Sequence, residues 1–380
     1  MAPLRLRDRD AIVTREGLIF RVFGYSHPPD AYICDVEYAP SEIFKSSNPK
    51  AFRSQRQCVF YKFYRDEGLK FVKKHHPQHL IFHEILCNDV VGVRKSDVFR
   101  VKKPDDKLRE LMTMKSKDEL LGALHDVLES TMKYSNLSTE NFGVFGSLLH
   151  DFYHPKFSDL DFVVYGREKA LKLRETLQEL YKNGDSRFKN EFESDELIIG
   201  KRWRLRNYSP KEYVWHQKRK LIYALFSGEK TGRTIKTEFE PVKEWKEIHN
   251  EYDPKARILR RGWIKMFARI TEDGDAPFIP SIYGIQPLNV LYGAREAYEA
   301  KRIVSFVEEF RMQARRDERV YVEGNLEEVA TPRGGFHQIT LTYCPRYYKQ
   351  VLKVVSQPLP ALRVLINRNS FLSFSKASPR

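Results

Sequence analysis

Two aspartates lie one residue apart at the start of an apolar run. In "FSDLDFVVYG" Asp159 and Asp161 flank Leu160 and precede "FVVY". Residues two apart on a strand point to the same face, so both carboxylates would project together while Leu160 faces a core. Two like charges so close repel each other, and a bound divalent cation relieves that cost. Carboxylates select Mg²⁺ or Mn²⁺, and Mg²⁺ usually shares its ligand shell with substrate phosphates, so the pair predicts a metal site.

A glycine-serine step lies upstream of the two aspartates. Gly146 and Ser147 stand between the expected strand "FGVFG" and the short segment "LLHDF". A glycine lets the backbone approach a phosphate closely, and the serine hydroxyl and the next backbone N–H groups can hydrogen-bond it. With the aspartates, this step predicts a triphosphate cradle that faces a metal-binding carboxylate pair.

A later strand offers a third carboxylate for a two-metal site. In "TIKTEFEPV" Lys236, Glu238 and Glu240 share one strand face, and either glutamate could complete the set. Nearby basic residues could neutralise charge on the nucleotide or on an acceptor backbone. These are Lys218, Arg219 and Lys220 in "HQKRK" and Lys201, Arg202 and Arg204 in "GKRWRLRNY".

The order of these elements resembles the DNA polymerase beta nucleotidyltransferase superfamily. That family carries Gly-Ser, a gap, and then Asp-x-Asp at the start of a hydrophobic strand. Here Asp159 lies twelve positions after Ser147, which is similar to the archaeal CCA-adding enzymes and related predicted archaeal nucleotidyltransferases. Those enzymes have a third carboxylate three residues before a proline, the place of Glu238 before Pro241. The resemblance covers roughly residues 117–245, and the third position holds Glu rather than the commoner Asp.

The resemblance implies a reaction and a set of roles. The reaction is Mg²⁺- or Mn²⁺-dependent transfer of a nucleoside monophosphate from ATP or another NTP to an acceptor hydroxyl, with release of pyrophosphate. Asp159, Asp161 and Glu238 would be the catalytic metal ligands. Gly146 and Ser147 would bind the β- and γ-phosphates.

The surrounding sequence predicts an α/β (α+β) chain of three domains and a tail. Residues 1–110 form a β-rich N-terminal domain that ends near "VKKPDDK", which is interpreted as a charged linker. Residues 111–250 form the nucleotidyltransferase domain with a mixed sheet. Residues 251–365 form a basic, β-barrel-like domain, for which an OB fold is one option. Residues 366–380 are expected to be a flexible tail.

Helix signals frame the expected catalytic strands. Ser116 and Glu119 form a capping box before one amphipathic helix, and a second helix closes at Gly184. A third helix opens at the capping box of "SPKE" (209–212) and is expected to stop at Gly228. The segment "RIVSFVEEFRMQA" fits the period of a strand and also that of a helix.

Charge favours a polyanionic partner. The chain of 380 residues has 66 Lys and Arg against 51 Asp and Glu, a net charge of +15. Residues 255–380 hold 21 basic and 12 acidic residues, so nine of these charges lie in the last third. Phosphate contacts dominate nucleic-acid binding, and we therefore expect RNA as a partner, tRNA or another structured RNA.

Other features exclude competing classes of protein. The four cysteines form no Cys-x-x-Cys pair, which argues against a zinc knuckle. No apolar run approaches the ~20 residues of a membrane span, and "MAPLRLRDRDAIV" lacks the apolar core of a signal peptide. The histidines in "KKHHPQHLIFHEIL" read as surface or packed side chains. We expect a soluble, cytoplasmic protein.

Two alternatives to RNA modification remain open at this point. The acceptor could be a protein side chain or a small molecule. The chain could also be a non-catalytic RNA-binding protein that keeps a vestigial transferase fold.

Overall fold

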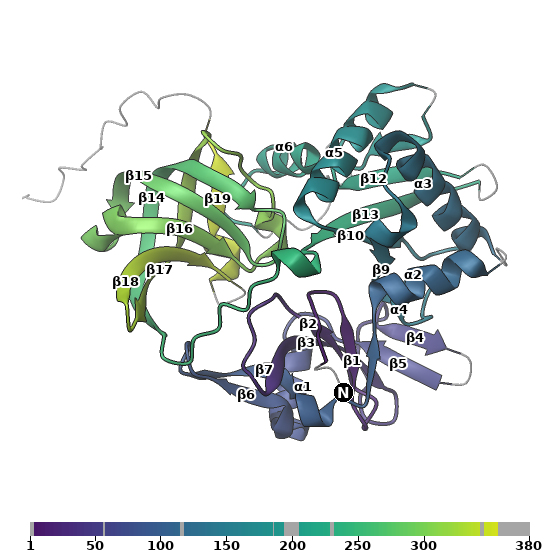
Figure 1. Ribbon diagram of the computed structural model, residues 1–380, viewed down its shortest axis with the longest axis horizontal. Helices are drawn as coiled ribbons and strands as arrows, with labels where there is room; N and C mark the ends of the chain where they lie inside the picture. Colours follow the sequence, from purple (N-terminus) through teal and green to yellow (C-terminus); the bar gives the residue numbers. More distant parts are fainter. Residues whose placement is uncertain are drawn as a thin grey trace, which may run out of the picture.

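Strand-forming segments dominate the chain and assemble into three separate sheets. The computed structural model describes residues 4–55, 58–114, 118–184, 186–193, 205–228, 232–342 and 346–355, and shows a mixed α/β architecture with few helices (Figure 1). Within these ranges, no helix is both long enough and apolar enough to cross a membrane. Ser116 and the predicted tail 366–380 lie outside the described residues.

The N-terminal sheet is β-rich, as its sequence predicts. Its order is β4-β5-β3-β2-β1-β8, and β7 pairs with β3 and with β6. Its elements are β1 (Ala11–Val13), β2 (Ile19–Val22), β3 (Ala31–Pro40), β4 (Phe52–Gln55), β5 (Cys58–Lys62), α1 (Glu67–His75), β6 (Leu80–His83), β7 (Asn88–Arg94) and β8 (Arg100–Lys102). Phe20, Val22 and Val36 belong to its apolar core.

The central sheet is mixed and has the order β11-β12-β13-β10-β9. β10 and β13 run parallel, and the other neighbours are antiparallel. The strands are β9 (Phe142–Val144), β10 (Leu160–Tyr165), β11 (Phe188–Asn190), β12 (Tyr223–Ser227) and β13 (Thr234–Val242). The predicted strands "FGVFG", "LDFVVYG" and "RTIKTEFEPV" are thus confirmed, with slightly different ends.

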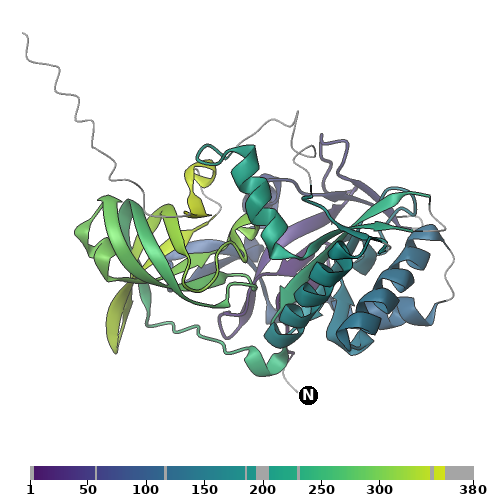
Figure 2. The same ribbon diagram turned by 90° about the horizontal axis from the view of Figure 1, so that it is seen from above.

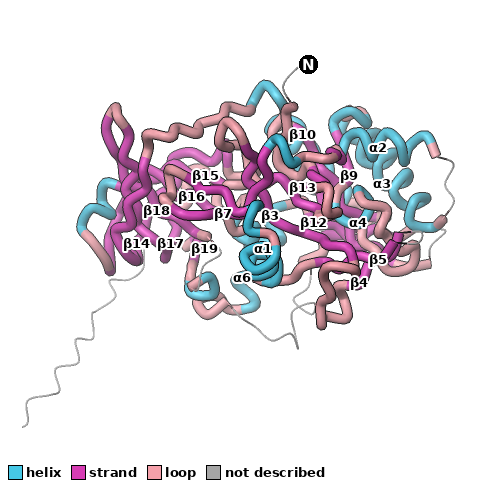
Figure 3. The backbone as a smooth tube through the Cα atoms, turned by 90° about the horizontal axis from the view of Figure 1, so that it is seen from below, coloured by secondary structure: helices cyan, strands magenta, loops and turns pink. Residues whose placement is uncertain are grey.

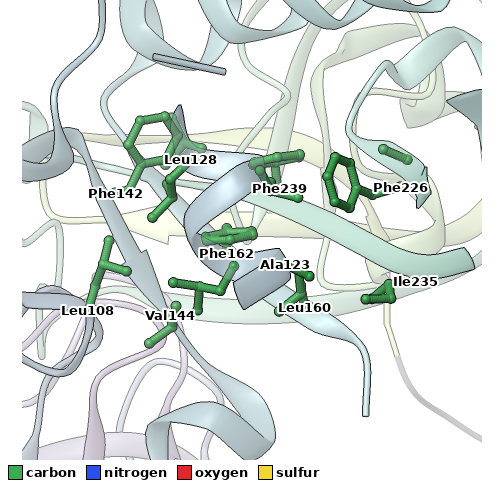
Figure 4. Packing of buried hydrophobic residues seen from close by; sticks show 14 of the residues in the cluster. Leu108, Ala123, Leu128, Phe142, Val144, Leu160, Phe162, Phe226, Ile235 and Phe239 are labelled. Atoms are coloured by element: carbon green, nitrogen blue, oxygen red, sulfur yellow. The ribbon is translucent and has the colours of Figure 1, made fainter. Parts of the chain in front are cut away.

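Three helices cover one face of the central sheet: α2 (Pro104–Thr113), α3 (Glu119–Ser135) and α5 (Arg167–Lys182). Their apolar stripes pack on strand side chains such as Leu160, Phe162 and Phe239, all of them buried (Figure 4). The Asp118 side chain caps α3 by accepting the backbone N–H of Leu121. The opposite face of the sheet is thereby left for contacts with the other two sheets.

Two boundaries differ from the sequence prediction. The expected linker "VKKPDDK" is instead the end of β8 and the first turn of α2, because Pro104 starts that helix. The helix that opens at Ser209 is α6 (Pro210–Lys220) and stops eight residues early. Leu221 ends α6 in the left-handed region at φ 57°, and the residues after it alternate as β12 against β13.

The C-terminal sheet closes into a barrel. It has the order β14-β15-β16-β18-β17-β19, and β14 also pairs with β17, which closes the ring. The strands are β14 (Arg257–Asp275), β15 (Ser281–Tyr292), β16 (Ala300–Ser305), β17 (Arg319–Thr331), β18 (Gly334–Leu341) and β19 (Val351–Val354). The ambiguous "RIVSFVEEF" is β16 followed by a 3₁₀ turn over Glu308–Phe310.

The three sheets meet at the face of the central sheet that the helices leave open. Seen from above and from below, the barrel and the helix-covered part of the central sheet lie at opposite ends (Figures 2 and 3). Val163, Tyr165 and Val242 of this face cluster with Tyr25 of the N-terminal sheet region and Phe278 of the barrel. All three parts of the chain therefore border the same surface.

Candidate active site

Asp161 of β10 and Glu238 of β13 lie opposite each other in register on neighbouring parallel strands. Phe162 and Phe239, the next residues, stack on the helix-covered face with ring centroids 5.2 Å apart. Because strand side chains alternate, both carboxylates point to the open face. Asp159, which directly precedes β10, lines the same cavity. Three acidic residues from two distant segments are thus brought together, as the sequence predicts.

The cavity over these residues has a volume of about 310 Å³, and half of its described lining residues are acidic. Its lining residues are Asp159, Asp161, Glu191, Phe192, Tyr213, Gln217, Tyr223, Lys236, Thr237, Glu238, Glu308 and Glu309. Six of these twelve are carboxylates. Lys236, the basic member of the lining, is paired with Glu191. A polyphosphate could enter such a field only together with cations.

Gly146 lies directly against Asp161. It has φ +61°, and a methyl group in place of its hydrogen would overlap Oδ2 of Asp161. The backbone N–H of Phe145 donates to the carbonyl of Asp161 at 3.0 Å, which fixes the two segments side by side. The short helix α4 (Gly146–Leu149) follows at once and contains Ser147. Gly146 of the predicted Gly-Ser step therefore adjoins Asp161, and only glycine fits there without strain. Neither Gly146 nor Ser147 is among the residues that line the cavity.

The pKa values of these carboxyl groups are raised, and a bound cation would lower them. Burial and then the charge of Asp159 raise the pKa of Asp161, and the charge of Lys62 opposes them, so that the pKa is about 7. Burial also raises the pKa of Asp159. For Glu238, burial and then the neighbouring Glu240 raise the pKa well above its usual range. A divalent ion among these groups would favour their ionised forms.

Glu240, the other candidate for the third carboxylate, is buried and engaged by two arginines. It is paired with Arg9 from the N-terminal segment and with Arg311, whose guanidinium lies 3.2 Å away. Arg311 also lies 3.5 Å from Oε1 of Glu238, whose side chain is 31% exposed. Glu238 lines the cavity and Glu240 does not. Of the two glutamates left open by the sequence, the geometry favours Glu238.

The carboxylate oxygens at this site are suitable ligands for a hard cation. Mg²⁺ and Mn²⁺ prefer carboxylate oxygens, which Asp159 and Asp161 provide side by side. In the described part of the chain, no three His, Cys, Asp or Glu side chains are already placed to hold a metal ion. Glu238 instead faces Arg311. The aspartate pair fits a metal, and the third candidate ligand is held by an arginine.

Of the basic residues predicted to bind nucleotide, Lys218 and Lys220 lie in the described part of the chain, and neither lines the cavity. Lys218 pairs with Glu193 at 2.7 Å, and Lys220 is buried with its Nζ donating to the Glu309 carbonyl at 2.8 Å. Burial and then Arg311 lower the pKa of Lys220 to about 7. Lys201, Arg202 and Arg204 lie outside the described residues. Helix α6 contributes Tyr213 and Gln217 to the lining instead.

Several lining residues could not be found from the sequence. Glu308 and Glu309 follow β16 of the barrel and reach the cavity because Lys220 and Gln217 hold the Glu309 carbonyl. Phe192 forms an aromatic wall with two tyrosines, with ring centroids 5.5 Å from Tyr223 and 6.4 Å from Tyr213. These residues come from separate elements without a shared spacing, so only the packing of the elements reveals them.

The histidine-rich segment is apart from this lining. His79 is buried and packs on Phe20, with ring centroids 4.9 Å apart. None of His75, His76, His79 and His83 borders the cavity. Their interpretation as packed or surface side chains agrees with these positions.

Comparison with known proteins extends over nearly the whole chain. Uncharacterized protein MJ1086 of Methanocaldococcus jannaschii is 26% identical over 346 residues, which cover 87% of this chain and 93% of that protein. No family model matches the chain. No solved structure matches it either. The chain is thus similar to another protein along its length, beyond the segment that carries the two aspartates.

Proposed function

We propose that this protein is a metal-dependent nucleotidyltransferase whose central sheet and helices form a polymerase-beta-like domain. The observation that carries the proposal is the arrangement around Asp161. Its register partner is Glu238, Asp159 lines the same cavity, and Gly146 lies against its carboxylate. Gly146, the aspartate pair and the third carboxylate come from three segments of the sequence and are thus brought together around Asp161. A solvated strand face would not need that convergence.

The residues have distinct roles in this proposal. Asp159 and Asp161 would hold Mg²⁺ or Mn²⁺, and Glu238 would be the third ligand. The bound metal would lower the pKa of the acceptor hydroxyl and neutralise charge on the triphosphate. The backbone at Gly146 can approach the phosphates closely, and the Ser147 hydroxyl can donate to them. Transfer would join the α-phosphate to the acceptor oxygen and release pyrophosphate.

The aromatic side of the cavity supports a nucleotide as the substrate. Phe192, Tyr213 and Tyr223 line it beside the carboxylates. Aromatic rings stack on nucleobases, each such contact being worth ~1–3 kcal/mol. The aromatic side of the cavity suits a flat base, and the adjoining charged side suits metal-bound phosphates.

RNA is the proposed acceptor, with tRNA or another structured RNA as the class. The charge surplus of residues 255–380 supports it, since these residues include the barrel. On the barrel, Arg346 lies over the Trp263 ring at 5.4 Å, which is an arrangement suited to stacking with bases. Glu308 and Glu309 of the cavity lining follow β16 of the barrel, so the barrel borders the cavity.

The experiment is incubation of the purified protein with Mg²⁺, each labelled NTP in turn, and total cellular RNA. An Asp159→Asn/Asp161→Asn double variant is the control, because it keeps the side-chain shape and removes both charges. Label on RNA that vanishes in the control supports the proposal. Label on protein or on a small molecule keeps the chemistry and changes the acceptor. RNA that is bound and never labelled would indicate a binding protein on a vestigial transferase fold.

A further inference from the structure

A positive side chain would help to hold a triphosphate in this site, and the basic side chains discussed so far within the described ranges are already engaged. Lys236 pairs with Glu191, and Arg219 pairs with Glu318. Arg233 donates to the carbonyls of Pro155 and Ser158 at 2.9 and 3.0 Å. Arg9 and Arg311 are buried in the network around Glu240, and Lys218 and Lys220 are held as described above. Among the residues that the structure describes, a basic side chain other than these would have to supply charge near Asp161.

Lys62, at the end of β5, approaches the site from the N-terminal sheet. On the same face of this strand, Phe60 packs on Phe152 with ring centroids 4.9 Å apart. The backbone N–H of Phe152 in turn donates to the Ser147 carbonyl at 2.8 Å. Figure 1 shows β4 and β5 beneath α4, in agreement with these contacts. The face of β5 that carries Lys62 is thus packed against the segment of the Gly-Ser step.

The ammonium group of Lys62 lies on this face of β5, beside the residues that line the cavity and not among them. Its Nζ lies 5.9 Å from the centre of the Tyr38 ring, and that ring packs edge-on against His150 at 5.2 Å, directly after α4. Its charge acts on Asp161, and also on Glu37 and Glu308. Yet within the described ranges no carboxylate lies within 4.0 Å of it as an ion-pair partner. Because Lys62 is near several carboxylates and forms no ion pair with any of those described, its N–H donors are available to a ligand.

We propose that Lys62, a residue outside the transferase segment, binds the phosphate chain of the nucleotide beside Gly146 and Asp161. This inference rests on the proposed function and adds that the N-terminal sheet supplies part of the substrate site. Lysine suits this role because its compact ammonium has three donors and approaches phosphate as a point charge. The ligand class is a triphosphate or an inorganic polyphosphate.

Binding of tripolyphosphate, ATP and adenosine in the presence of Mg²⁺, measured by calorimetry, tests this role without requiring turnover. The variants are Lys62→Gln, Lys62→Arg and the matched control Lys50→Gln, an exposed lysine of the same domain. We expect Lys62→Gln to weaken tripolyphosphate and ATP binding about 10- to 100-fold, which is the usual range for a lost charged hydrogen bond. Adenosine binding should stay within about 2-fold, Lys50→Gln should match wild type, and Lys62→Arg should recover most of the affinity.

The outcomes separate this inference from the proposed function. Wild-type protein that transfers nucleotide while Lys62→Gln binds tripolyphosphate normally would overturn the role of Lys62 and leave the function intact. A phosphate-specific loss in Lys62→Gln, in a protein that never transfers nucleotide, would support the role and refute the function. Absence of tripolyphosphate binding by wild type would overturn the inference. So would an equal loss for adenosine, or a lower thermal midpoint in Lys62→Gln without a phosphate effect, because Lys62 would then only balance Glu37 and its neighbours.

Discussion

Arg311 of the barrel and Glu238 of the central sheet form an ion pair across the boundary between the two, with 3.5 Å between Nη2 and Oε1. The same guanidinium lies 3.2 Å from Glu240, and its side chain is only 1% exposed. A buried charge is tolerated only when it is paired. The barrel therefore contributes the charge that keeps two glutamates on the same face of β13 together, and its docking and the shape of the proposed site are coupled.

Replacing Arg311 should destabilise the fold strongly. Arg311→Met leaves Glu238 and Glu240 without their shared partner, and breaking a buried pair costs about 3–5 kcal/mol. Urea denaturation at pH 7.5 measures this loss, and Arg311→Lys should lie between the variant and wild type. Arg316→Gln is the control, because Arg316 is exposed and its ion pair with Asp317 is long, at 4.0 Å. This variant should change the free energy of unfolding by less than about 0.5 kcal/mol. A loss below about 1 kcal/mol in Arg311→Met would contradict the importance of this pair.

Asp161→Asn should make the metal-free protein more stable at alkaline pH. The pKa of Asp161 is about 7 in the folded chain against 3.8 for the ordinary carboxyl, because burial opposes its charge. The folded state therefore holds a proton that the unfolded state has lost, and the wild-type free energy of unfolding falls as pH rises from about 4 to 7. The amide cannot ionise and avoids this loss. We expect a gain on the order of 1–3 kcal/mol at pH 8 and none near pH 3.5.

Thermal unfolding in EDTA at several pH values measures the difference between Asp161→Asn and wild type. Asp8, Asp10 and Asp35 also have pKa values raised to about 7, so the wild-type curve alone mixes several groups. Comparison with the variant isolates Asp161. A variant that is less stable than wild type at pH 8 would show that the charge of Asp161 is compensated in the folded chain.

Added Mg²⁺ or Mn²⁺ should stabilise wild type and not the aspartate variants. A ligand at 100 times its Kd adds about 2.7 kcal/mol to the free energy of unfolding. The effect should be larger at pH 8 than at pH 6, because protons compete with the metal for Asp161, whose pKa is about 7. Thermal midpoints with and without 10 mM Mg²⁺ measure it, and Ca²⁺ is a useful comparison. An equal shift in the Asp159→Asn/Asp161→Asn variant would place the metal elsewhere.

The local sequence predicted the site residues that lie on or beside the two central strands, β10 and β13. The alternation over "TIKTEF" at the start of β13 follows from one buried and one open face, as a half-buried strand requires. In "LDFVVY" five of the six residues are buried, and Asp161 is the partly exposed position. The capping box at Ser209 and Glu212 is confirmed on both sides, at 3.2 and 2.8 Å. The helix end after it was wrong, since the apolar run "IYALF" fits a helix as well as a strand, and its pairing with β13 decides between them.

The surroundings of the site could not be derived in the same way. Arg9, Glu240, Glu308 and Arg311 are separated by up to about 300 positions, and nothing in their local sequences distinguishes them from exposed charges. They become buried partners only when three sheets dock. The same holds for Lys62, which lies in a strand with no chemical pattern of its own. Tertiary packing, not propensity, gives these residues their roles.

Gly146→Ala should disturb the proposed site more than the fold. An alanine methyl group would overlap the Asp161 carboxylate, and φ +61° is disfavoured for a residue with a Cβ. We expect a stability loss of about 1–2 kcal/mol, and a transfer rate at least ~10²-fold lower because a displacement near 1 Å of a metal-binding group is enough for that. Gly184→Ala is the matched control: no heavy atom lies within 4 Å of its added Cβ, so both quantities should stay near wild type. Urea denaturation and single-turnover transfer measure the two effects separately. If Gly146→Ala lost stability and kept its full transfer rate and its Mg²⁺-induced thermal shift, Asp161 would not need its present position, and the cradle assigned to Gly146 would have to be abandoned.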